Sequence, residues 1–115
     1  MSSEILNARI STTFLGYDDH GIFTLYLTLE MDGAGIVVGG YALDTWNDTE
    51  RTGTAKGMNL LAKLLQVVGV STWEELPNQY IRVVSNGLGR KISKIGHLMQ
   101  NEWLDFEEFF MEEAQ

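Results

Sequence analysis

A long stretch of helical periodicity lies in the middle of the chain, from about Thr54 to Val68. Its apolar side chains recur every three or four residues, which places them on one side of a helix. The expected apolar stripe comprises Met58, Leu61, Leu65 and Val68, and it is widened by Leu60, Leu64 and Val67. A helix with one apolar side needs a second layer of structure against that side, so the flanking segments have to supply it.

Strand-like alternation of apolar and polar residues precedes this helix. Two alternating stretches, Leu6 to Phe14 and Ile22 to Glu30, flank a polar turn with glycine at both ends, and they predict an antiparallel hairpin. The alternation places the even-numbered residues of the first stretch, Phe14 included, on one face. A third strand is expected over Ile36 to Leu43, where a Gly-Gly pair indicates a bulge or the close approach of another group.

The second half of the chain returns to strand patterns. Tyr80 to Val84 and Arg90 to Met99 predict a further pair of strands, and a short capped turn is expected at residues 71–76. Residues 44–50 are expected to form a polar loop, and the acidic tail over 105–113 a short helix. This order predicts an α+β fold with a mostly antiparallel β-sheet, one main helix packed across it and a short C-terminal helix.

The composition limits the classes of function. The chain has the size of a single domain, 1–115, and its formal net charge of −8 argues against general binding to DNA or RNA, which needs a basic surface. The lack of cysteine excludes disulfides, thiolate metal sites and a cysteine nucleophile, and it suits a reducing cytoplasm. No apolar run of membrane-spanning length and no signal-peptide pattern occur, so we expect no association with a membrane.

The segment that leads into the main helix has the composition of an anion site. Gly53 and Thr54 stand at the helix start, with Arg51 just before them and Lys56 in the first turn. A helix start offers unpaired N–H groups and a partial positive charge, and the flanking cations add to its attraction for a phosphate. In an acidic chain this favours a specific anionic ligand. The alternative is that Thr52 or Thr54 only caps the helix.

Residues suited to catalysis or to metal binding form no strong pattern. His20 lies beside Asp18 and Asp19 in the first turn, whereas His97 lies in a strand far along the chain. The sequence contains no helical histidine pair, EF-hand pattern, Walker motif or nucleophile elbow. We therefore expect a protein that is not an enzyme and that holds no metal or cofactor, with His20 as a turn residue that bonds to the backbone.

A nucleotide site would also need flat side chains and further cations. The residues able to stack on a base are Trp46, Trp73, Tyr80 and Trp103. The last two predicted strands contain Arg82, Arg90, Lys91 and Lys94. If the helix start faces these strands, the cations would form one electropositive hollow. The alternative is that the cations are solvated edge charges and that the aromatic residues pack in the core or in an interface.

Motifs over nearly the full length form a further pattern: Asn7-Ala8-Arg9-Ile10, Leu15-Gly16-Tyr17-Asp18-Asp19-His20-Gly21-Ile22, Gly39-Gly40-Tyr41-Ala42-Leu43-Asp44, Arg51-Thr52-Gly53-Thr54-Ala55, Val68-Gly69-Val70-Ser71-Thr72-Trp73-Glu74, Ile95-Gly96-His97 and Trp103. In these motifs the chain resembles the first-described family of anti-Thoeris sponge proteins of phages. The resemblance implies a binder that sequesters a glyco-cyclic ADP-ribose signal intact, in the cytoplasm of the infected bacterial host. It also implies a homo-oligomer, a dimer or larger, with pockets where two subunits meet. Some members of the family bind cyclic oligonucleotides at separate sites.

The resemblance also assigns residues to the ligand sites. Arg51 corresponds to the family's ligand-contacting arginine, and Asn86 to a ligand-contacting asparagine in the late hairpin. Ser85 and His20 correspond to weaker matches that belong to the second kind of site. The candidates for stacking on adenine are Trp73, Tyr80 and Trp103. The region around Glu102 departs from the family because no cation is near it in the sequence.

Alternative functions remain open at this point. A small acidic phage protein can inhibit a host protein by direct contact, with the acidic residues between Glu102 and Glu113 as its binding surface. A hydrolase or lyase that acts on the nucleotide would have His20 and His97 as its only plausible acid–base pair.

Overall fold

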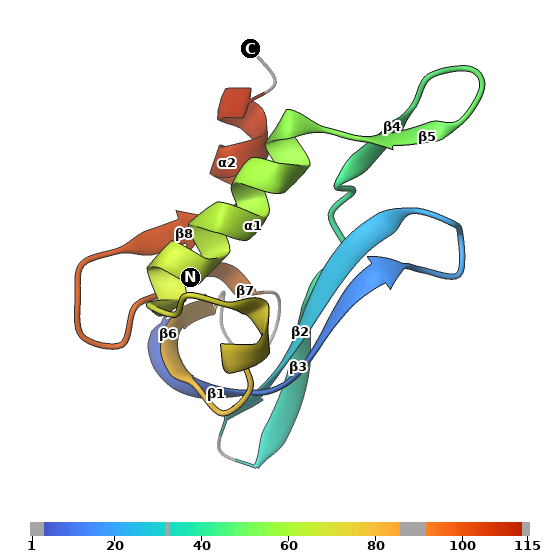
Figure 1. Cartoon of the computed structure of the whole chain (residues 1–115). Helices are drawn as coiled ribbons and strands as arrows, with labels where there is room; N and C mark the ends of the chain where they lie inside the picture. Colours follow the sequence, from blue (N-terminus) through green and yellow to red (C-terminus); the bar gives the residue numbers. More distant parts are fainter. Residues whose placement is uncertain (1–3, 32, 86–91, 114–115) are drawn as a thin grey trace.

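A six-stranded antiparallel sheet is the main element of the fold (Figure 1). The computed structural model of the protein describes residues 4–31, 33–85 and 92–113. The strands of this sheet are β1 (Glu4–Tyr17), β2 (Phe23–Met31), β3 (Ala34–Gly39), β6 (Tyr80–Ser85), β7 (Ile92–Gly96) and β8 (Trp103–Asp105). They lie in the order β3-β2-β1-β6-β7-β8, and every neighbouring pair is antiparallel.

The helices lie on one side of this sheet. Helix α1 (Ala55–Val68) runs across the sheet, and α2 (Phe106–Glu113) packs beside it (Figure 1). A short 3₁₀ turn, η1 (Trp73–Glu75), follows α1 at the place where a capped turn is expected. The predicted fold class is therefore confirmed: an α+β fold with a mostly antiparallel sheet, one main helix and a short C-terminal helix.

Helix α1 begins and ends where its local sequence predicts. The hydroxyl of Thr54 accepts a hydrogen bond from the Gly57 N–H at 2.9 Å, which satisfies one of the free donors of the first turn. Gly69 ends the helix in the left-handed conformation, with φ of 93°, and its N–H donates to the Leu65 carbonyl. Thr54 therefore caps α1, which leaves open whether the same segment also binds an anion.

The buried side of α1 is turned away from the expected stripe. Leu60, Leu64 and Val67 are completely buried, whereas Met58 is 66% exposed. Gly57 explains the rotation, because a Cβ atom there would lie 2.4 Å from the Leu43 carbonyl oxygen. The missing side chain lets the helix approach the backbone closely, and the residues that follow Gly57 on the same side become the core.

A bulge in β1 changes which face its side chains occupy. The register of β1 with β2 shifts between Ile10 and Thr12, and the Ser11 hydroxyl donates to the Thr28 carbonyl at 3.2 Å. Ile10 is buried under α1, but Phe14 pairs with Tyr26 on the opposite face. The expectation that all even-numbered residues share one face is therefore wrong after Ile10, because one extra residue reverses the alternation.

The third strand is shorter than expected, and a hairpin replaces the expected loop. Strand β3 ends at Gly39, where a Cβ atom would lie 2.2 Å from the Leu25 carbonyl oxygen and φ is 130°. The Gly-Gly pair thus marks a close approach to β2, after which the chain leaves the sheet. The start of the expected polar loop forms β4 (Asp44–Trp46), which pairs with β5 (Arg51–Gly53) from the segment that leads into α1. The two strands make a sheet that projects beyond the start of α1 (Figure 1).

The face of the main sheet opposite α1 is uncovered in the described chain. Apolar side chains stand on it in the open: Ile5 is 61% exposed, Val37 59% and Tyr80 57%. Their neighbours Ala8, Val38 and Ile81 are buried on the helix side, as the alternation of each strand requires. One face of the sheet thus forms the core, and the other presents exposed apolar side chains beside the Arg9–Glu30 ion pair.

Candidate functional site

Arg51 is bound by a carboxylate of its own chain. Its Nε donates to Asp44 Oδ2 at 2.9 Å and its Nη2 donates to Asp44 Oδ1 at 2.8 Å, so the pair is bidentate. The β4–β5 hairpin brings the two residues together, since Asp44 lies on one strand and Arg51 on the other. The Arg51 side chain that was expected to face a ligand is therefore already engaged along one edge of its guanidinium group.

Asp44 is held at the junction of several elements. It is 7% exposed, and its Oδ2 also accepts from the Phe23 N–H at 3.2 Å. The hydrogen bonds from Arg51 hold the pKa of Asp44 below its usual range, and the Phe23 N–H adds to the effect. Asp44 thus remains ionised at neutral pH and fixes the orientation of the guanidinium group.

A hollow of about 340 Å³ lies beside this ion pair at the start of α1. Its lining residues are Tyr41, Ala42, Asp44, Thr45, Thr54, Lys56 and Phe110. Lys56 Nζ donates to the Phe110 carbonyl at 3.3 Å and lies 5.5 Å from the centre of its ring. The hollow thus combines hydroxyl groups, one ammonium group, the Asp44 carboxylate and aromatic rings. Its size is near the lower end of small-molecule pockets, which begin at about 300 Å³.

Aromatic stacking builds the wall of this hollow. The Tyr41 ring stacks on Phe106 and on Phe110, with centroid distances of 5.1 Å in both pairs. Helix α2 therefore contributes its aromatic residues to the core and to the hollow, and its exposed residues Glu107 and Glu108 remain on the outside. The N-terminal end of α2 is capped by Asp105, whose Oδ1 accepts from the Glu108 N–H at 3.1 Å.

The structure brings together only part of the predicted site. Arg51, Gly53 and Thr54 lie together at the start of α1. His20 is in the β1–β2 turn. Asp18 of the same turn is close enough to Arg51 for each charge to shift the pKa of the other. Trp73 lies beyond the other end of α1, in η1. These positions connect the turn at His20 with the helix start but leave Trp73 apart from both.

The remaining predicted residues lie on β6, β8 or outside the described part. Tyr80 begins β6 on the uncovered face, where it pairs with Arg9 of β1. Ser85 ends β6, is fully buried, and its hydroxyl makes no hydrogen bond within the described part of the chain. Asn86 lies outside the described residues. Trp103 begins β8 and is partly buried.

Arg82, for which the sequence allows either a place in an electropositive hollow or a solvated position at the sheet edge, lies over the Trp103 ring. The Arg82 guanidinium is 4.7 Å from the centre of the Trp103 ring, and the ring itself lies against Gly96, where a Cβ atom would be 2.4 Å from it. Arg82 is also fixed by donating to the carbonyls of His97 and Gln100, each at 2.8 Å. The cation that the sequence lacks near Glu102 is thus supplied from β6, across two strand pairings.

The two histidines lie in different parts of the molecule. The Nδ1 atom of His97 accepts from the N–H groups of Met99 and Gln100, and its ring packs against Gly69 at the end of α1. Strand β1 shows how far apart they are. Its Asn7 pairs with Arg82, which pairs with Gly96, the residue before His97, whereas His20 follows the other end of β1 at Tyr17. Ten residues of strand span roughly 33 Å, so the acid–base pair of a hydrolase is not assembled.

The described residues form neither a metal cluster nor a membrane-spanning helix. Residues 4–31, 33–85 and 92–113 contain no group of three or more histidine, aspartate or glutamate side chains placed to hold a metal ion. Among the helices of the described part, none has the length and apolar character to cross a membrane. Comparisons with protein-family models, with curated proteins and with solved structures find no match for this chain.

Proposed function

We propose that the protein binds a cyclic nucleotide immune signal, of the glyco-cyclic ADP-ribose type, and holds it without hydrolysis. The proposal rests on the resemblance described above and on one observation of the structure, the hollow at the start of α1. Its hydroxyl and ammonium groups suit phosphate oxygens, and its aromatic wall suits a base. Cyclic oligonucleotides belong to the same class of ligand, whereas duplex nucleic acid needs a broad basic face.

The ion pair with Asp44 defines how Arg51 would take part. Asp44 occupies the edge formed by Nε and Nη2, and Nη1 makes no hydrogen bond within the described part of the chain. A guanidinium group has five N–H donors, so the Nη1 side remains for a phosphate oxygen while the carboxylate fixes the plane of the group. In this arrangement Asp44 is a positioning residue and Arg51 contacts the ligand.

A second subunit would complete the pocket. The hollow of about 340 Å³ is open, and a ligand with an adenosine, a diphosphate and a second ribose needs more enclosure than one such hollow gives. The uncovered face of the sheet has exposed Ile5, Val37 and Tyr80 beside the Arg9–Glu30 ion pair, and this mixture of apolar and polar groups suits a surface for self-association. We therefore propose a homo-oligomer in which the site is shared between subunits.

The inhibitor alternative has its own observation. Glu107 and Glu108 are exposed on α2 and could contact a basic host protein. Truncation after Asp105 does not test this hypothesis cleanly, because it would remove Phe106, which is fully buried, and Phe110 from the core. A Glu107→Gln/Glu108→Gln variant changes the charge alone, and loss of a host partner with nucleotide binding intact would favour the inhibitor.

Return of the unmodified ligand tests the proposal. The protein is incubated with glyco-cyclic ADP-ribose, free ligand is removed, and the protein is denatured by heat before mass spectrometry. We expect the intact cyclic molecule in a fixed ratio to the subunits. Recovery of ADP-ribose or of another linear product would refute sequestration, and recovery of nothing would refute binding.

Charge variants then locate the site. Lys56→Gln should weaken binding by about tenfold to 150-fold, since one hydrogen bond to a charged group contributes about 1.5–3 kcal/mol. Lys63→Gln is the matched control, because Lys63 lies on the same helix and lines only a separate hollow of about 160 Å³. Equal affinities for the two variants would show that the ligand binds elsewhere.

A further inference from the structure

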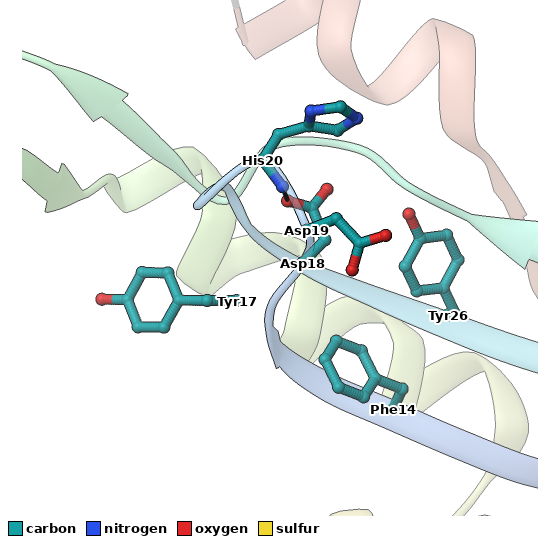
Figure 2. Close-up of a pocket in the computed structure, with 6 residues that line it drawn as sticks. All are labelled: Phe14, Tyr17, Asp18, Asp19, His20 and Tyr26. Carbon is teal, nitrogen blue, oxygen red and sulfur yellow. Dashed lines mark hydrogen bonds between the residues drawn. The ribbon is translucent and has the colours of Figure 1, made fainter.

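A second hollow lies beside the β1–β2 turn, on the uncovered side of the sheet (Figure 2). It encloses about 410 Å³, which is within the range of small-molecule pockets. The residues that line it are Phe14, Tyr17, Asp18, Asp19, His20 and Tyr26. Aromatic and acidic side chains therefore share one concave surface, and the described lining contains no lysine or arginine.

The aromatic part of this lining is a cross-strand pair. Phe14 and Tyr26 lie opposite each other on β1 and β2, with ring centroids 6.0 Å apart and planes inclined at 43°. The bulge in β1 places Phe14 on this face, and 42% of the residue is exposed. Because the rings are tilted rather than stacked, part of each ring face is not covered by the other ring. Ring faces carry negative electrostatic potential.

The acidic part comes from the turn between the same two strands. Asp18 Oδ1 accepts from the N–H groups of His20 and Ile22 at 2.8 and 3.1 Å. These bonds, chiefly that from Ile22, hold the pKa of Asp18 below its usual range and keep the carboxylate ionised. Figure 2 shows the carboxylate of Asp19 turned toward Phe14 and Tyr26, while the His20 ring points away from them.

Asp19 has no partner of opposite charge in the described part of the chain. Both ion pairs found there involve other carboxylates, Arg9 with Glu30 and Arg51 with Asp44. Arg51 offsets part of the charge of Asp18, but the Asp19 carboxylate and the two ring faces still repel an anion and attract a cation. We propose that this hollow is a binding site for a small organic cation of the alkylammonium class, held against the Phe14 and Tyr26 rings and paired with Asp19.

The inferred site has the opposite charge preference to the hollow at the start of α1. A phosphate placed beside Asp18 and Asp19 would meet like charges, whereas an ammonium group would be attracted by the carboxylates and by the ring faces. The inference rests on the rings and the carboxylates alone, so it does not depend on the proposed nucleotide ligand.

Choline and its neutral isostere 3,3-dimethylbutan-1-ol provide the test. Each is titrated into isotopically labelled protein at low ionic strength, and chemical shifts are followed by NMR. We expect saturable shifts at Phe14, Asp19 and Tyr26 with choline and much smaller shifts with the alcohol, because the two molecules share a shape and differ in charge. No saturable shift with choline, or equal responses to both molecules, would overturn the proposal.

Variants with a matched control separate the two contributions. Asp19→Asn should weaken choline binding about twofold to fivefold, and Phe14→Leu by a similar factor, from the known strength of exposed cation–π and ion-pair contacts. Asp48→Asn makes the same charge change at an exposed turn residue with φ of 79°, a conformation that asparagine accepts. This control should bind choline like the wild type. An effect of Asp48→Asn as large as that of Asp19→Asn would show that only the net charge matters, and the proposed site would be wrong.

Discussion

Substitution of Gly57 by alanine tests how closely α1 packs against the rest of the fold. A Cβ atom at this position would lie 2.4 Å from the Leu43 carbonyl oxygen, 2.8 Å from the Leu43 Cα and 2.9 Å from its carbonyl carbon. All of these atoms belong to the backbone, so no side chain can rotate to make room. The helix itself has to move by about 1 Å, since ordinary contacts between such atoms are about 3.5 Å.

The expected loss of stability follows from two opposing effects. Overpacking in a well-packed region costs about 1–3 kcal/mol, and the backbone clash places this position at the upper end. Alanine favours a helix over glycine by about 1 kcal/mol, which offsets part of the cost. The unfolding free energy should therefore fall by about 2 kcal/mol, which corresponds to a decrease in Tm of about 8 °C for a domain of this size.

Urea unfolding followed by far-UV circular dichroism measures this change. Gly53→Ala is the control, because a Cβ atom at Gly53 would meet nothing within 4 Å and its φ is not positive. That variant should keep the stability of the wild type or gain about 0.4–1 kcal/mol through the entropy of the unfolded chain. If Gly57→Ala is as stable as Gly53→Ala, the close packing of α1 on Leu43 is not a real feature of the protein.

Other predictions concern the cap, the ion pair and the stacked arginine. Thr54→Ala should lower the unfolding free energy by about 0.5–2 kcal/mol in urea titrations, whereas Thr54→Ser should retain most of it; equal losses would show that the hydroxyl does not cap α1. The depressed pKa of Asp44 makes its contribution to stability complete above its ordinary value of 3.8 and lost as the pH falls below that value. Arg51→Gln, which removes the cause of the shift, should flatten this acid dependence in pH-resolved thermal melts, and an unchanged slope would refute the role of the pair. Arg82→Gln should change the fluorescence of Trp103 and expose its ring to acrylamide quenching, while an unaltered quenching constant would contradict the stacking.

Features that depend on neighbouring residues in the chain were predictable from the sequence. Helix α1 has its cap, its apolar period and its terminal glycine within one continuous stretch, and the first hairpin has its turn between two alternating segments. Asp105 caps α2 for the same local reason. In each case the interactions that define the element lie a few residues apart, so a pattern in the sequence contains them.

Features set by strand register and close packing were not predictable in the same way. The bulge near Ser11 depends on how β1 twists between its partners β2 and β6, and no residue type near Ser11 indicates a bulge. Arg82 reaches Trp103 only because β6, β7 and β8 lie side by side, and the Asp44–Arg51 pair needs a hairpin of short polar strands. A glycine such as Gly57 indicates close packing only once its neighbour Leu43 is known.

The hold of Asp44 on Arg51 also sets which anions can compete for that arginine. A carboxylate fastened to the same hairpin acts at a high effective concentration, so a free anion that seeks the same edge of the guanidinium starts at a disadvantage. Inorganic phosphate has a single binding group and would not displace Asp44, whereas a larger molecule could do so because it makes further contacts elsewhere on the protein. If Arg51 contacts the proposed ligand, this competition from Asp44 disfavours simple anions, and Asp44→Asn should raise the affinity for inorganic phosphate in a titration.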